Sequence, residues 1–404
     1  MLLNRARAEE KMEEYDLEAL IATSSSNVFY ASNLCPYGKC FAILPRDPKI
    51  EPAIIAPISG PTPIALMSEP WIDDVRYYGE FYTTTQYAQE PLNSAELKLI
   101  QAQESWERTK VADPTSAIIG LLKERNIVSG KVGVDESNLP LGHQFWRRLK
   151  NDLQSLEPVS AQKIFSEIRM IKSEEEIERI KKAIRITEEA WETALEQSKE
   201  GMTEREFEEI FQQTVFSKGG KIVPYMGMYG FPLAFGRRTA FVDIAQPSNY
   251  RLKSGDLIRF DGGCSYMGYP CDMARTAVLG EPDQKLEKYY EAILAGEQAA
   301  IEMAEPGVIS SEIFRKAVET VRKNGIPHYR RHHTGHGWGI DGYDPPLIGP
   351  NDNTRLEEGM LLCFETPYYE VGRGGPMVED VILITKNKAR FLTEAERELR
   401  IIRH

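Results

Sequence analysis

The sequence predicts a two-domain protein, with an α/β domain over residues 1–163 followed by an α+β domain over residues 164–404. A chain of 404 residues is too long for one ordinary hydrophobic core. In the first part, short apolar runs alternate with helical patterns, which is typical of a layered α/β sheet. After residues 162–173 the pattern changes, and long amphipathic helices are grouped between strands that favour antiparallel pairing.

The N-terminal domain begins with charged residues at helical spacing over 5–15. Four short apolar runs follow that have the length and composition of buried strands, and helical patterns over 94–125 and 139–151 flank the last of them. The predicted strands are Leu17–Ala22, Cys40–Leu44, Pro52–Ala56 and Lys131–Asp135. This alternation predicts a sheet with helices packed on it.

The second domain opens with a long amphipathic helix that begins near Lys172. Ser173 and the glutamates after it are typical of an N-cap with an acidic first turn. A second helix begins at Thr203, where Thr203 and Glu206 have the spacing of a capping box. The remaining predicted elements are strands at 222–241, 256–263 and 271–279, helices at 283–304 and 310–324, and strands at 359–369 and 376–385.

The charge of the chain argues against a nucleic-acid partner. The formal net charge is −12 and the pI about 5.3, so the surface repels phosphate backbones. The nearest basic cluster is Arg330-Arg331 with its flanking histidines, which is too short for a groove-binding stripe.

The N-terminus turns charged at once, and no apolar run approaches the ~20 residues that span a bilayer. Five scattered cysteines favour a reducing compartment over a disulfide framework. We therefore expect a cytoplasmic protein that does not bind membranes.

Two acidic residues lie on consecutive apolar strands of the segment 256–278. Asp261 ends the first strand and Asp272 opens the second, with glycines between them that permit a tight reversal. A hairpin therefore sets the two carboxylates side by side. Such carboxylates repel each other and cost several kcal/mol to desolvate, an objection that a bound divalent cation removes.

The segment 359–385 repeats this arrangement, with Glu365 on one apolar strand and Glu379 on the next. Between the two hairpins, His336 projects from a glycine-rich stretch. Four carboxylates and one imidazole suit two divalent ions about 3.5–4 Å apart. Oxygen-rich ligands with one histidine and no thiolate favour Mn(II), Co(II) or Fe(II) and make zinc a weaker candidate. Each residue alone would usually be a cap or turn residue, so the inference depends on all five occurring together.

At these residues the sequence closely resembles the pita-bread family, which includes methionine aminopeptidase, aminopeptidase P, prolidase and creatinase. The metalloenzymes of that family carry Asp, Asp, His, Glu and Glu in this order. The intervals here are 11, 64, 29 and 14 residues, which are those of the prolidase branch. Further similar motifs are Arg169–Ser173, Gly201–Glu204, Gly255–Asp256 and Gly359–Met360. The resemblance implies a pita-bread catalytic domain over 164–404 and a creatinase-type N-terminal α/β domain over 1–163.

By resemblance, Asp261 and Asp272 bind one metal ion, His336 completes the other site, and Glu365 and Glu379 help to bridge the two ions. The nucleophile implied is a metal-bridging hydroxide, because two cations lower the pKa of bound water. Glu365 is the residue implied to shuttle the proton between that water and the leaving group.

Three positions depart from the prolidase pattern. Ile244 and Tyr343 stand where that branch has histidines that hold the substrate carbonyl and the tetrahedral oxygen, and Met377 replaces an arginine. Losing such donors typically costs about 10²–10³ in rate each. Tyr343 is able to replace one donor, and Tyr343 and Asp344 are the candidate catalytic residues beside Glu365.

Aromatic and cationic residues near these motifs are candidates for an unusual substrate pocket. An aromatic cage would hold a quaternary cation, and a pair of arginines would hold a substrate carboxylate. Core packing and surface ion pairs are the alternative explanations. The candidate substrate-binding residues are His332, His333, Trp338, Tyr225, Tyr229, Arg237 and Arg238.

Three functions remain open. The first is a metal-dependent hydrolase of the prolidase/creatinase type, acting on a C–N bond (amide or Xaa-Pro-like) of a small substrate such as a dipeptide. The second is a lyase on the same scaffold, which would cleave a small zwitterion such as dimethylsulfoniopropionate with Asp341, Tyr343 or Asp344 as the base. The third is a non-catalytic binding module, although such modules usually lose their metal ligands. The resemblance also implies a homodimer.

Overall fold

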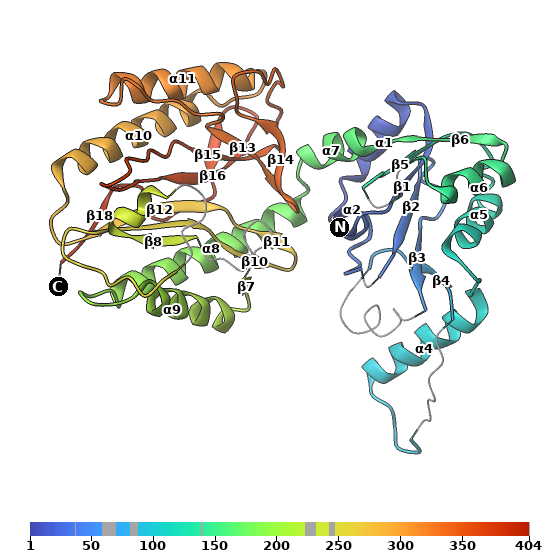
Figure 1. Cartoon of the computed structure of the whole chain (residues 1–404). Coiled ribbons are helices and arrows are strands. Elements are labelled where there is room, and N and C mark those ends of the chain that lie inside the picture. Colours follow the sequence, from blue (N-terminus) through green and yellow to red (C-terminus); the bar gives the residue numbers. More distant parts are fainter. Residues whose placement is uncertain are drawn as a thin grey trace. The chain divides into compact units, whose positions relative to one another are not determined.

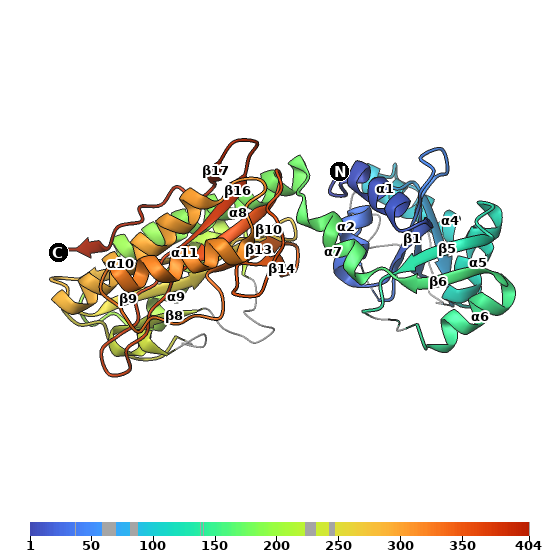
Figure 2. The same ribbon diagram turned by 90° about the horizontal axis from the view of Figure 1, so that it is seen from above.

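The computed structural model describes residues 1–36, 38–58, 70–80, 88–137, 139, 141–222, 232–241 and 247–403. The chain forms two compact units, Met1–Arg169 and Met170–His404, which Figures 1 and 2 show from two directions. Each unit has its own hydrophobic core. The division falls inside helix α7 (Gln162–Met170), as does the boundary at 163/164 expected from the sequence.

Unit 1 is built on a mixed six-stranded sheet. Its strands in spatial order are β4 (Asp74–Tyr78), β3 (Ala53–Pro57), β2 (Phe41–Pro45), β1 (Leu17–Ala22), β5 (Ser129–Val134) and β6 (Ser155–Ser160). Its helices besides α7 are α1 (Arg5–Glu14), α2 (Ser25–Ser32), α4 (Ser94–Thr109), α5 (Pro114–Glu124) and α6 (Gln144–Asp152). The four runs predicted as strands form β1, β2, β3 and β5, which confirms the predicted α/β sheet.

Two helices replace the single helical stretch predicted over 94–125. The break lies before Pro114, and Asp113 caps the new helix by accepting a hydrogen bond from Ser116 N at 3.0 Å. Proline suits a first helical turn and cannot continue a preceding helix, so the boundary follows from the sequence. The strands β4 and β6 are not predicted. Both are edge strands with many partly exposed residues, and they lack a clear apolar period.

The described residues of unit 2 form a nine-stranded sheet, a three-stranded sheet and four α-helices. The path of the larger sheet is β14 (Gly342–Leu347), β13 (Gly335–Gly339), β15 (Leu361–Glu365), β16 (Glu379–Ile384), β12 (Met273–Leu279), β9 (Leu257–Gly262) and β8 (Leu233–Phe235). Beside this path, β17 (Ala389–Phe391) pairs with β16 and β18 (Arg400–Ile402) with β12. The smaller sheet has β11 (Tyr269–Pro270), β10 (Cys264–Tyr266) and β7 (Lys221–Ile222). The helices are α8 (Glu174–Glu196), α9 (Glu204–Ser217), α10 (Gln284–Met303), α11 (Ser310–Lys323) and the short 3₁₀ helix η2 (Gly236–Ala240).

The strongest local predictions in unit 2 are confirmed. Capping boxes close at Ser173 and at Thr203, where α8 and α9 begin. The strands β9 and β12 pair antiparallel, and so do β15 and β16, so both predicted hairpins are present. Of the strand predicted over 222–241, residues 223–231 lie outside the described residues, and the described part forms the end of β7, then β8 and η2.

The helices of unit 2 pack on one face of the large sheet, and the acidic residues lie on the other face. On β9, Phe260 stacks against Trp191 of α8. On β15, Phe364 belongs to the core formed with α10 and α11. Successive side chains of a strand point to opposite faces, so Asp261 and Glu365 lie on the face turned away from these helices.

The strand that carries His336 is not predicted, because glycine has low strand propensity and three of the five residues of β13 are glycine. These glycines allow a close backbone approach. A Cβ atom at Gly335 would lie 2.4 Å from the carbonyl oxygen of Cys363, and one at Gly337 would lie 2.3 Å from that of Pro345. Tertiary packing therefore overrides local propensity here.

None of the helices in the described part of the chain is both long enough and apolar enough to cross a membrane.

Candidate metal centre

The backbone register brings three of the predicted ligands into one row across the sheet. Asp261 is the cross-strand partner of Ala274. Ala274 is also the partner of Glu379, and Glu379 is the partner of Glu365. Directly opposed residues of neighbouring strands project from the same face, so these three carboxylates share one face of the sheet.

The other two predicted ligands follow from the same alternation. Asp272 is two residues before Ala274 and so shares its face. His336 is the cross-strand partner of Cys363, which is two residues before Glu365. All five predicted ligands therefore project from the same face, together with the thiol of Cys363.

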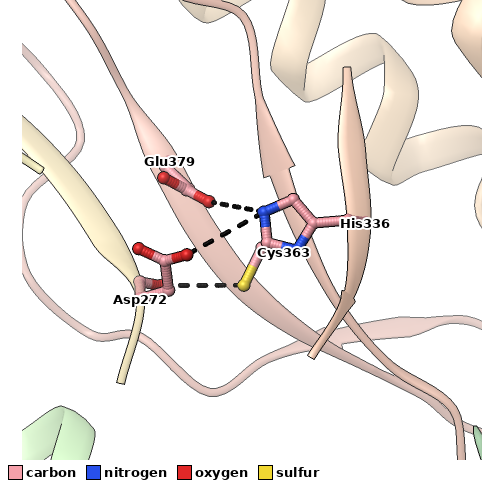
Figure 3. Close-up of side chains that lie close together, drawn as sticks. All are labelled: Asp272, His336, Cys363 and Glu379. Atoms are coloured by element: carbon pink, nitrogen blue, oxygen red, sulfur yellow. Dashed lines mark hydrogen bonds and ion pairs between the residues drawn. The ribbon is translucent and has the colours of Figure 1, made fainter. Parts of the chain in front are cut away.

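The side-chain distances fit ligands that converge on a cation. His336 Nε2 lies 3.8 Å from Asp272 Oδ2 and 3.7 Å from Glu379 Oε1, as Figure 3 shows. These separations are too long for hydrogen bonds. They match the spacing of about 3–3.8 Å expected between two ligands of one ion, given bond lengths of about 2.0–2.3 Å.

The electrostatics of the site also fit a cation. Burial, together with the charges of neighbouring carboxylates, raises the pKa of Asp272 and that of Glu379 well above their usual values. Within the described part of the chain, Glu379 Oε1 is buried and has no hydrogen-bond partner. A buried carboxylate oxygen without a donor is costly, and a divalent cation would supply the missing partner. The residues present therefore fit the metal ions that the sequence predicts.

His336 is held in the form that binds metals. Its Nδ1 donates to the carbonyl oxygen of Gly337 at 3.2 Å, which leaves the Nε2 lone pair facing the carboxylates. Burial lowers the pKa of His336 to about 4, so the imidazole is neutral at physiological pH.

Glu365 is held by two residues that the sequence does not assign to it. His333 Nε2 donates to its Oε1 at 2.5 Å, and Arg331 Nη2 donates to its Oε2 at 2.9 Å. Burial alone would raise the pKa of Glu365, but the charge of Arg331 and the hydrogen bond from His333 hold it at about 2. Arg331 belongs to the basic pair seen in the sequence, and only its distance from Glu365 reveals its place in the site.

Tyr343 covers the imidazole of His336. The two rings stack with centroids 3.7 Å apart and planes inclined by 19°. The rest of the Tyr343 side chain is accessible to solvent, since the residue is 56% exposed. Burial of part of the ring and the charge of Glu365 raise the pKa of Tyr343 well above its usual value, so its hydroxyl remains a donor at neutral pH.

Asp344, the other candidate catalytic residue, lies on the opposite face of the sheet. It is the cross-strand partner of Gly337, whose neighbour His336 faces the carboxylates. Asp344 Oδ2 forms a buried ion pair with Lys172 Nζ at 3.4 Å. The alternation of side chains along β14 therefore separates Asp344 from Tyr343.

The candidate substrate-binding residues are placed differently from one another. Trp338 is buried and donates to the carbonyl oxygen of Pro270 at 2.7 Å. His332 is exposed and packs edge-on against His333, with ring centroids 4.0 Å apart. Arg237 is exposed on η2. Arg238 forms an ion pair with the buried Glu204 at 2.9 Å, and Tyr225, Tyr229 and Ile244 lie outside the described residues.

The row of ligands crosses the junction between β12 and β16, which we call the seam. The strands β12 and β16 share a single registered pair, whereas β9 and β12 share six. Side chains supply bonds that the backbone does not. Thr276 Oγ1 donates to the Met377 carbonyl at 2.8 Å and accepts from Met377 N at 2.9 Å. Arg275 donates to the Glu379 carbonyl at 2.7 Å and pairs with Asp380 at 2.5 Å.

Comparison with known proteins places this arrangement in a family. The model of the metallopeptidase family M24 matches residues 178–386. The Xaa-Pro dipeptidase of Pyrococcus horikoshii is 34% identical over 264 residues, which cover 65% of this chain and 73% of that protein. A putative dipeptidase of Bacillus subtilis is 30% identical over 290 residues, covering 72% and 78%.

Solved structures agree with this assignment. The prolidase from Pyrococcus horikoshii superposes with a TM-score of 0.70 at 26% identity, over 98% of this chain and 99% of that one. An X-Pro aminopeptidase from Thermotoga maritima has a TM-score of 0.74 at 19% identity over 99% of both chains, which shows a shared fold. The predicted combination of an α/β N-terminal domain and a pita-bread C-terminal domain is confirmed. The chain belongs to the metallopeptidase family M24 and is a metal-dependent hydrolase of the peptidase type.

Proposed function

We propose that this enzyme hydrolyses a C–N bond, amide or Xaa-Pro-like, in a small substrate such as a dipeptide, with two divalent metal ions held by Asp261, Asp272, His336, Glu365 and Glu379. The observation that carries the proposal is the arrangement of these five side chains on one face of the sheet, with a neutral imidazole and with Glu379 Oε1 lacking a donor among the described residues. The relatives named Xaa-Pro dipeptidase support the substrate class.

Two divalent ions in this position would lower the pKa of a bridging water and so supply the nucleophile at neutral pH. Glu365 is ionised because Arg331 and His333 hold its pKa at about 2. Its Oε1 is able to receive the proton of the attacking water. His333 Nε2 donates to the same atom at 2.5 Å and so holds the carboxylate in place, and Glu365 itself then passes the proton to the leaving nitrogen.

Tyr343 is suited to stabilise the developing negative charge on the carbonyl oxygen. Its hydroxyl is protonated at neutral pH, and its ring is anchored on His336. A preorganised donor of this kind typically contributes about 10²–10³ in rate. We assign Asp344 a different role, namely to hold β14 in place through its ion pair with Lys172. Contacts of His332, Trp338, Arg237, Tyr225 and Tyr229 with substrate stay predictions.

The test uses protein stripped with a chelator and reloaded separately with Mn²⁺, Co²⁺ or Fe²⁺. A panel of Ala-Pro-type dipeptides should be hydrolysed by the reloaded enzyme but not by the stripped one, with ¹⁸O from labelled water in the carboxylate product. A Glu379→Gln variant is expected to be inactive with every ion.

The same assay includes dimethylsulfoniopropionate, because a lyase on this scaffold would cleave it without incorporating water. The relatives described above are named as peptidases or dipeptidases, which favours hydrolysis. Cleavage of this zwitterion with no ¹⁸O uptake, together with inert dipeptides, would replace the hydrolase proposal by the lyase one. Full activity in the metal-stripped enzyme would refute both.

A further inference from the structure

Cys363 lies inside the metal centre, although the ligand set predicted from the sequence contains no thiol. It is fully buried on β15, directly opposite His336 in the register. Its Sγ lies 3.8 Å from the carbonyl oxygen of Asp272. One ligand atom each from Asp272, His336, Cys363 and Glu379 lies within 4.8 Å of all the others, as Figure 3 shows.

We propose that Cys363 is an additional ligand of the ion held by Asp272, His336 and Glu379, and that its sulfur makes this position prefer thiophilic divalent cations such as Zn²⁺ and Cd²⁺ over Mn²⁺. The inference rests on the proposed metal centre and adds to it a ligand and a metal preference. Cysteine sulfur, histidine nitrogen and carboxylate oxygen are all ligands that zinc binds in proteins. Soft sulfur ligands favour zinc and cadmium, whereas manganese prefers oxygen.

Cys363 and Glu365 lie on the same strand, two residues apart. Both oxygens of Glu365 are engaged, one by His333 and the other by Arg331. These two donors fix the position of Glu365, whose ligand atom also lies within 4.8 Å of that of His336. Cys363 reaches the space near His336 from the same strand, two residues away, where the alternation of side chains directs it to the same face.

The surroundings of the thiol also point to a ligand. Glu379 is 2% exposed, and its Oε1 has no hydrogen-bond partner among the described residues. A carboxylate oxygen of Glu379 lies within 4.8 Å of the sulfur of Cys363. When a cation binds, the sulfur lone pair forms the bond to the metal and the thiol proton leaves to solvent, because a coordinating thiol is deprotonated.

Cobalt spectroscopy tests the sulfur bond directly, because a Co²⁺–thiolate bond produces a charge-transfer band in the near ultraviolet. All proteins carry Cys35→Ser, since Cys35 is an exposed thiol that would bind cobalt by itself. Metal-stripped protein titrated with Co²⁺ is expected to show the band. The band should disappear in Cys363→Ser and remain in the matched control, Cys264→Ser. The control also removes a fully buried thiol, which is hydrogen-bonded to Thr187 on α8.

Calorimetric titration with Zn²⁺ and with Mn²⁺ measures the preference. Loss of a residue that only supports a ligand already lowers metal affinity by about 10–100-fold, so Cys363→Ser should weaken Zn²⁺ binding by about tenfold or more. Mn²⁺ affinity should change by much less. Zn²⁺ binding at neutral pH should release about one proton more from the parent protein than from Cys363→Ser.

The possible results separate this inference from the proposed function. If the parent protein binds Co²⁺ without a thiolate band, or if the band survives in Cys363→Ser, sulfur ligation is refuted and the metal centre stands. If the parent protein binds none of the three ions, the metal centre itself is refuted. Should Cys363→Ser fail to fold, ¹¹³Cd NMR of the parent protein decides, because a sulfur ligand shifts the cadmium resonance strongly downfield of an all-oxygen-and-nitrogen site.

Discussion

At the residue scale, the site gathers buried carboxylates whose negative charges repel one another. Glu379 shows this repulsion clearly. Burial raises its pKa, and the charges of Asp272, Glu365 and Asp261 raise it further. Its Oε1 has no hydrogen-bond donor within the described chain. A buried carboxylate without a partner destabilises the folded protein, and a bound cation would offset this destabilisation.

We therefore predict that Glu379→Gln stabilises the metal-free protein. The amide has nearly the same shape but no charge to desolvate, so the free energy of unfolding in a chelator should rise by about 1–3 kcal/mol. The same variant should lose most of the stabilisation that metal gives the parent protein. Urea unfolding with and without Mn²⁺ measures both effects. A variant less stable than the parent in the chelator would show that the buried carboxylate is already satisfied without a cation.

The pH dependence of stability should reveal the same groups. Carboxylates whose pKa is raised on folding, here Asp272 and Glu379, bind protons more tightly in the folded state. Their contribution is most favourable near or below the usual carboxylate pKa and is lost as pH rises. The Tm of chelator-treated protein should therefore fall between about pH 5 and pH 8.

Saturating Mn²⁺ should remove this fall, because the cation stabilises the ionised carboxylates. The low pKa of Glu365, about 2, acts only below the usual carboxylate range and does not affect this window. Differential scanning fluorimetry over the pH series provides the measurement. A gap between the metal-bound and metal-free Tm that stays constant with pH would contradict the assignment.

At the scale of elements, the centre depends on how β12 and β16 are joined. Asp272 directly precedes β12 and Glu379 begins β16, yet these strands share one registered pair. The hydroxyl of Thr276 and the guanidinium of Arg275 bridge the seam by hydrogen bonds to the backbone of β16 and of Met377 just before it. Side chains thus set the separation of ligands that the two hairpins supply.

We predict that Thr276→Val lowers Mn²⁺ affinity by about 10-fold or more, a cost typical of residues that support metal ligands. The matched control is Thr187→Val on α8. It also removes a buried hydroxyl that accepts a backbone hydrogen bond, here from Cys264 N at 3.0 Å. Both variants should lose stability, but only Thr276→Val should lose metal affinity. Calorimetric titration with Mn²⁺ distinguishes the two variants. Equal Mn²⁺ affinities would show that Thr276 does not help to position the metal ligands. Thr276→Ser, which keeps the hydroxyl, should restore most of the affinity.

At the scale of the whole molecule, the described ligands all belong to unit 2, and each unit has a separate core. Binding to one unit stabilises that unit by mass action and leaves an independently folded unit unchanged. The two-unit organisation therefore has a thermodynamic consequence as well as a structural one.

We predict two transitions in scanning calorimetry, of which only one depends on metal. Adding Mn²⁺ in excess of its dissociation constant should raise one Tm by several degrees, and a chelator should reverse the change. Cys363→Ser, compared in the presence of Zn²⁺, should affect only the same transition. One transition that moves as a whole would indicate that the units unfold together.

We also propose that the enzyme is a homodimer, as the family resemblance implies. Gel filtration with light scattering at micromolar concentration should give a mass near twice 45.9 kDa. A monomer under these conditions, in the presence of metal, would exclude the dimer as the working form.

Much of this protein is determined by sequence patterns that act locally. Capping boxes at Ser173 and Thr203 mark the starts of α8 and α9, and short apolar runs mark the strands of both predicted hairpins. The five predicted ligands are readable because a carboxylate on a buried strand is physically unexpected unless a cation offsets its charge. The spacing of those residues, which resembles that of the prolidase branch, agrees with the family to which the chain belongs.

Tertiary structure decided what depends on contacts between distant segments. Arg331 and His333 reach Glu365 from more than thirty residues away in sequence, and no local pattern marks such a pair. Cys363 was within reach of prediction, since it precedes Glu365 by two residues on the same strand. Its neighbour His336, however, comes from a glycine-rich strand whose existence depends on packing against β15. Local periodicity specifies which face a side chain occupies, whereas the groups that meet on that face are set by strand order and register.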